Sequence, residues 1–146
     1  MEDQFQTLVK DGIAAANAGN TSLALRHLLE AADLDESPEL HSHLAYCLAK
    51  ENHDFPQAIS LGRSALRDEP WNSRHYLNLG RIYLLSGRRQ DAIRIFRDGL
   101  LHENNPRIKE ELASLGTRKY PVIASLPREH TLNRMLGKFL SRLKLR

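Results

Sequence analysis

A pair of small and aliphatic residues recurs along this chain at a fixed interval of 34 positions. Its three copies are Ala24-Leu25, Ala58-Ile59 and Ala92-Ile93. The residues four and seven positions after each alanine are also small or apolar, and these steps place them on one face of a helix. Self-similarity on this scale predicts a solenoid of stacked helix pairs, because one pair cannot bury its apolar face alone.

The stretch from Tyr76 to Gly99 displays one such pair most clearly. Its first helix carries on one face Tyr76, Leu79, Gly80 and Tyr83, and its second helix carries Ala92, Phe96 and Gly99. Gly87 lies between them and can end the first helix with a positive φ. The small residues Gly80 and Ala92 allow the two backbones to approach closely, while the aromatic rings fill the space around them.

The motif Tyr76-x-x-Leu79-Gly80-x-x-Tyr83, followed by Ala92-x-x-x-Phe96, resembles the tetratricopeptide repeat pattern, with tyrosine in place of its leading tryptophan. The resemblance covers about three repeats, over residues 3–105. It implies an all-α, right-handed superhelical solenoid of three antiparallel helix pairs. The first helix of each pair would line the concave side.

Polar residues mark where several of these helices should begin. The residues placed to cap them are Thr21, Ser37, Asp54 and Asn72. Asn105-Pro106 begins a further short helix, and Gly116 ends it. We expect this helix to cap the solenoid, so that residues 1–116 form one domain.

Residues 117–146 differ in character from the rest of the chain. Pro121 and Pro127 favour an extended strap, after which a basic amphipathic helix is predicted from Glu129 to Arg146. The side chains expected to make its contacts are Arg134, Lys138, Phe139 and Arg142. Residues 1–116 hold 13 lysines and arginines against 17 acidic residues, whereas residues 117–146 hold 8 against one, Glu129. This division of charge predicts that the tail meets something acidic.

Three interpretations of the tail remain open. The helix could dock on the acidic solenoid, or lie on an anionic membrane with its leucines buried. It could also bind nucleic acid, but only Tyr120 and Phe139 offer rings for stacking and no recognised nucleic-acid motif occurs. A peripheral membrane module is therefore the alternative function, and nucleic acid is not expected as a partner.

The sequence predicts neither catalysis nor a cofactor. His41 and His43 are two positions apart on a predicted helix and point in different directions, which argues against a metal site. Cys47 lies among apolar residues and is interpreted as a small core residue. One cysteine excludes an internal disulfide, and the acidic N-terminus lacks the features of a signal peptide, so a cytoplasmic location is expected.

The resemblance to tetratricopeptide repeats also implies which residues line the concave groove. These are Val9, Ile13, Tyr46, Lys50, Arg74, Leu77, Arg81, Leu84 and Leu85. Tyrosine and arginine are residue types that often dominate binding at interfaces. The groove leucines could instead be covered by the chain's own strap or tail.

The groove lacks the carboxylate clamp that some members of the family use to grip chaperone C-termini. The matching positions read Val9, Ile13, His43, Arg74 and Asn78, where only Arg74 keeps the expected charge. We therefore expect a non-enzymatic adaptor that binds a peptide or helix of another protein. Its oligomeric state stays open, since exposed terminal helices could also pair between copies.

Overall fold

The computed structural model describes residues 1–116, 131 and 135. The chain divides into two compact units, Met1–Leu115 and Gly116–Arg146. The first unit is all-helical, with no strand among its described residues. Its helices are α1 (Glu2–Asn17), α2 (Thr21–Ala32), α3 (Pro38–Asn52), α4 (Phe55–Asp68), α5 (Ser73–Leu85), α6 (Arg89–His102) and α7 (Pro106–Ser114). The predicted strap and tail helix lie outside the described residues.

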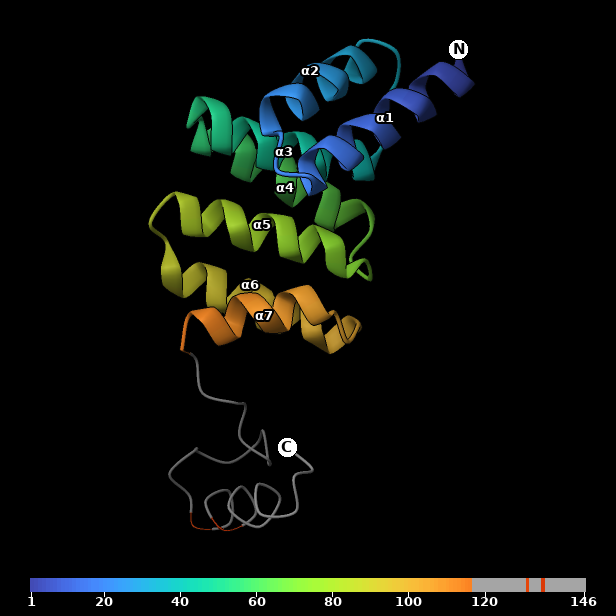
Figure 1. Cartoon of the computed structure of the whole chain (residues 1–146). Helices are drawn as coiled ribbons and strands as arrows, with labels where there is room; N and C mark the ends of the chain where they lie inside the picture. The colour runs from blue at the N-terminus through green and yellow to red at the C-terminus, as the bar shows by residue number, and fades with distance from the viewer. Residues whose placement is uncertain (117–130, 132–134, 136–146) are drawn as a thin grey trace. The chain divides into compact units, whose positions relative to one another are not determined.

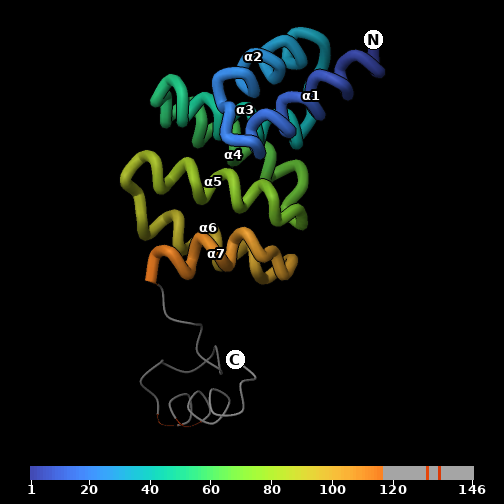
Figure 2. Tube along the Cα trace, in the orientation of Figure 1, coloured from blue at the N-terminus to red at the C-terminus, as the bar shows by residue number. Residues whose placement is uncertain are grey.

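The helices of the first unit pack as three consecutive pairs, as the 34-residue period predicts. α1 packs on α2, α3 on α4 and α5 on α6, while α3 also contacts both α2 and α5. The pairs follow one another along the unit, and α7 packs on α6 at its end (Figure 1). Figure 2 traces this path as a tube. α7 occupies the place expected of the capping helix.

Side-chain caps begin several of the helices. Side-chain oxygens accept a hydrogen bond from a backbone N–H in the first helical turn, at 3.1–3.2 Å. They belong to the hydroxyl of Ser37, the carboxylate of Asp54 and the amide of Asn72. These three predicted caps are confirmed. Each such bond satisfies a donor that has no partner within the helix.

The predicted cap of α2 is wrong by one residue. Asn20 is the N-cap, and its Oδ1 accepts from the backbone N–H of Leu23 at 3.2 Å. Thr21 is already helical, and its hydroxyl donates instead to the carboxylate of Glu51 on α3. Thr21 therefore ties two neighbouring helix pairs together rather than starting a helix.

The core of the third pair is built around Phe96, which is fully buried. Its ring lies against the backbone of Gly80, so closely that a Cβ atom there would come within 2.7 Å of its Cζ atom. Ala92 is also fully buried. At Gly87 the backbone has φ 77°, which ends α5 as predicted. The close approach expected from Gly80 is thus the central contact of this pair.

We predict that Gly80→Ala lowers the free energy of unfolding by about 1–3 kcal/mol, the usual cost of overpacking a core. The added methyl group would overlap the Phe96 ring, which has no free space to move into. Urea denaturation of the purified protein measures the change.

Gly62→Ala is the matched control. The nearest atom to its Cβ atom would be Leu79 Cδ1, at 3.2 Å, so a small shift of this side chain relieves the contact. Alanine also favours a helix over glycine by about 1 kcal/mol. Equal destabilisation by both substitutions would contradict the packing described for Gly80.

Candidate functional site

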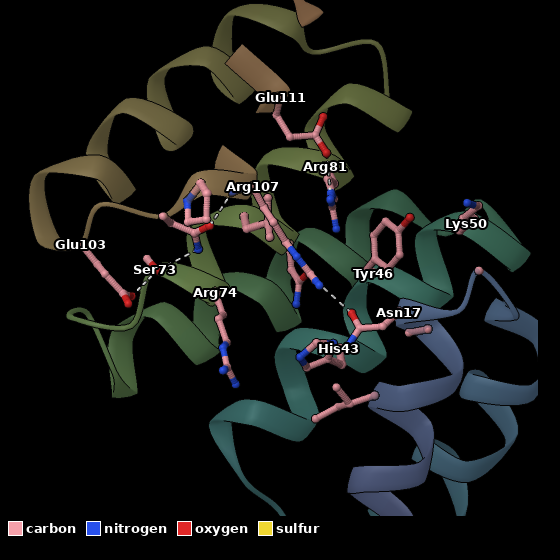
Figure 3. A pocket seen from close by; sticks show the side chains of 17 residues that line it. Asn17, His43, Tyr46, Lys50, Ser73, Arg74, Arg81, Glu103, Arg107 and Glu111 are labelled. Atoms are coloured by element: carbon pink, nitrogen blue, oxygen red, sulfur yellow. Dashed lines mark hydrogen bonds and ion pairs between the residues drawn. The ribbon is translucent and has the colours of Figure 1, made fainter. Parts of the chain in front are cut away.

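A cleft of about 680 Å³ runs along one side of the first unit. Its lining side chains come from α1, α3, α5 and α7 and from the connections beside them (Figure 3). α1, α3 and α5 are the first helices of the three pairs, and these are the helices expected to form the groove. The second helices, α2, α4 and α6, cover the opposite side of the first helices and contribute no helical residue to the lining.

Six of the nine predicted groove residues line the cleft. They are Ile13, Tyr46, Lys50, Arg74, Leu77 and Arg81. Lys50 and Arg74 are exposed, Tyr46 and Arg81 are half-buried, and Leu77 is buried in the floor.

The other three predicted groove residues lie outside the cleft. Val9 is only 3% exposed and packs in the core, because it shares its helix face with Phe5 and Gly12, which are buried as well. Leu84 is half-buried against the core of the third pair, and Leu85 is exposed beyond the cleft. Their assignment to the groove is corrected on these grounds.

Further cleft residues were not among those predicted. Among them are His43, Asn78, Glu103, Asn105, Arg107 and Glu111. Arg107 and Glu111 are four residues apart on α7, so they share one face of that helix. This spacing could have indicated that the capping helix presents a polar face toward the groove.

An aromatic ring lies at the centre of the cleft with two cations beside it. The Lys50 Nζ atom and the Arg81 Cζ atom each lie 5.9 Å from the centroid of the Tyr46 ring. Arg81 also donates from Nε to the Glu111 carboxylate at 2.6 Å, which joins α5 to α7. Cations at this distance from a ring are attracted to its face.

Polar contacts hold the floor together beneath this ring. Asn78 on α5 donates from Nδ2 to the hydroxyl of Ser42 on α3 at 2.9 Å, and both side chains are buried. A buried hydrogen bond between two helices fixes their spacing, since breaking it leaves polar groups without partners. This bond therefore helps to hold α3 and α5 together beside the cleft.

His43 lies in the same floor and is 9% exposed. Burial lowers the pKa of its imidazole from the usual 6.5 to about 4, and the charges of His75, Arg74, Arg81 and Arg107 lower it further. His43 is therefore neutral at pH 7. The charges of three arginines that line the cleft thus disfavour protonation of this one ring.

The described residues contain no group of side chains that could hold a metal ion. No cluster of three or more histidine, cysteine or acidic residues there could hold a metal. Burial raises the pKa of the Cys47 thiol to about 12, with a further contribution from the charge of Glu51, so the thiol stays protonated at pH 7. None of the described helices is long and apolar enough to span a bilayer.

The predicted tail contacts cannot be placed. Arg134, Lys138, Phe139 and Arg142 lie outside the described residues. The alternative of membrane attachment depends on them and stays a prediction from the sequence.

Consecutive helix pairs with a shared cleft along their first helices define the class as an α-helical repeat protein. Residues 49–115 match the family model described as Tetratricopeptide repeat. This match supports the resemblance to the tetratricopeptide repeat family that the motif and the period predicted. No curated protein matches the chain.

We predict that His43 makes the unfolding free energy depend on pH. Because its pKa is lower in the folded than in the unfolded protein, only the unfolded chain binds the proton between about pH 6.5 and pH 4. Stability therefore falls as the pH drops through this range. From pH 7 to pH 5 the loss due to His43 is on the order of 2 kcal/mol.

His43→Gln keeps a polar side chain of similar length and removes this titration. Urea denaturation of both proteins at pH 7 and pH 5 measures the difference, and an NMR titration of the His43 ring reports its pKa directly. The same pH dependence in both proteins would contradict the assignment.

Proposed function

We propose that the protein is a non-enzymatic adaptor whose cleft holds a segment of another protein. The main observation behind this proposal is the cleft, which is lined by side chains from four helices, α1, α3, α5 and α7. Tetratricopeptide repeats generally mediate interactions between proteins, and residues 49–115 match that family.

The chemistry of the lining favours a protein segment over a small metabolite. Pockets for small molecules are lined mostly by apolar side chains with a few polar groups. Most of this lining is polar or charged, and its central residues, Tyr46 and Arg81, are of the types that dominate protein interfaces. A peptide can satisfy many such groups along its backbone and side chains.

A cytoplasmic location belongs to the same proposal. Cys47 is a free, buried thiol, which suits the reducing compartment in which such thiols persist.

We expect Tyr46→Ala/Arg81→Ala to reduce recovery of the bound partners about tenfold or more. Truncating a central tyrosine or arginine typically weakens an interface by about 2 kcal/mol or more. Affinity capture with quantification of each co-purifying protein measures the loss, and circular dichroism verifies that the variant is folded.

Arg67→Ala/Leu101→Ala is the matched control, because both side chains are exposed and neither lines the cleft. Since Tyr46 also contacts the core, a second cleft variant, Lys50→Ala/Arg74→Ala, changes only exposed residues. Undiminished recovery of the same partners by both cleft variants would refute the proposed function.

A further inference from the structure

Positive charge gathers in the cleft although the helical unit as a whole is acidic. Residues 1–116 carry a net charge of −4, from 13 lysines and arginines and 17 acidic residues. The cations that line the cleft are Lys50, Arg74, Arg81 and Arg107, against two carboxylates, Glu103 and Glu111. The acidic residues of the unit therefore lie mostly outside the cleft.

Both carboxylates of the cleft are already engaged. Glu111 accepts from Arg81 at 2.6 Å, and Glu103 accepts from the hydroxyl of Ser73. Arg74 pairs with Glu39 at 3.6 Å, but both side chains are largely exposed, and such pairs contribute little. Within the described residues, Lys50 and Arg107 have no carboxylate within 4.0 Å, so neither forms an ion pair there.

Arg107 makes a bond that reaches across the cleft. It lies at the start of α7 and donates from Nη1 to Oδ1 of Asn17, at the end of α1, at 3.2 Å (Figure 3). Both side chains are exposed. The acceptor is a neutral amide, and a carboxylate in its place would form a charge-assisted bond that is about twice as strong.

Three of the cleft cations act on one buried ring in its lining. The charges of Arg74, Arg81 and Arg107 each lower the pKa of His43, which lines the same cleft. An anionic group bound in the cleft would be attracted by the same charges. Ile13 and Leu77 also line the cleft and suit an aliphatic neighbour in the ligand.

The positive charge of the cleft favours some of its possible ligands over others. Residues 117–146 carry 8 lysines and arginines against one acidic residue, so like-charge repulsion opposes their entry. Nucleic acid would match the charge, but the cleft offers one aromatic ring, Tyr46, for stacking bases. An acidic protein segment matches both the charge and the mixed floor.

We propose that the segment bound in the cleft is acidic, and that one of its aspartate or glutamate side chains replaces Asn17 as the acceptor of Arg107. Arg74 and Arg81 line the same cleft and add to its attraction for the carboxylate. This inference rests on the proposed function and names the chemistry of the partner. It requires a side-chain carboxylate and no free C-terminus, unlike the carboxylate clamp, of whose positions only Arg74 keeps the expected charge here.

The test uses a fluorescently labelled peptide of four Glu-Leu-Ser repeats, acetylated and amidated so that it has no terminal charge. Peptides with glutamine or lysine in place of glutamate are its controls. We expect the glutamate peptide to bind the full chain at least tenfold more tightly than either control in low salt. Its affinity should fall as salt is added, because exposed charges are screened.

Three substitutions locate the carboxylate. Arg107→Ala should weaken binding of the glutamate peptide about tenfold. Asn17→Asp should weaken it as well, because the new carboxylate occupies Arg107, whereas Asn17→Ala frees Arg107 and should leave binding equal or tighter. Arg67→Ala, outside the cleft, should change nothing.

The outcomes separate this inference from the proposed function. If the glutamine or lysine peptide binds as well and Tyr46→Ala/Arg81→Ala abolishes it, the cleft binds proteins but the acidic partner is refuted. If Asn17→Asp binds as tightly as Asn17→Ala, the position assigned to the carboxylate is refuted. If no peptide binds but a labelled oligonucleotide does, both proposals fail.

Discussion

The fold depends on the close approach of the two helices within a pair, which in the first and third pairs requires a residue without a side chain. A Cβ atom at Gly80 would meet Phe96, one at Gly12 would meet Leu28, and one at Gly99 would meet Tyr76. In each case a large apolar side chain of another helix fills the space that glycine leaves, which gives the dense packing of a protein interior. Since the first and second helices meet so closely, each first helix keeps another side for contact with its neighbours along the stack.

The cleft forms because the first and second helices of each pair have different neighbours. The second helices cover one side of α1, α3 and α5, so the remaining side of these three helices is left to form a common surface. α7 adds Arg107 and Glu111 to that surface although it belongs to no complete pair. The site therefore combines a repeated part, which supplies the floor, with a single terminal helix that supplies one wall.

The period of 34 residues was enough to predict the helix pairs, because each helix face is encoded locally, by residues three and four positions apart. The same reasoning succeeded for the caps at Ser37, Asp54 and Asn72, and six of the residues that it assigned to the groove line the cleft. It failed for Val9. The resemblance to the family assigned this residue to the groove, but the helix face that carries Val9 is buried in the core. The contact between α1 and α7 could not be predicted from the sequence. Its residues are 90 positions apart, and their distance depends on how the pairs stack and not on any local pattern.

The bond from Arg107 to Asn17 has a mechanical consequence. In a stack of repeats each unit normally touches only its neighbours. Here α1 and α7, the first and last helices of the first unit, are also joined directly, by one bond at 3.2 Å between exposed side chains. An acceptor that replaces Asn17 at Arg107 would remove this direct bond between the two ends of the unit.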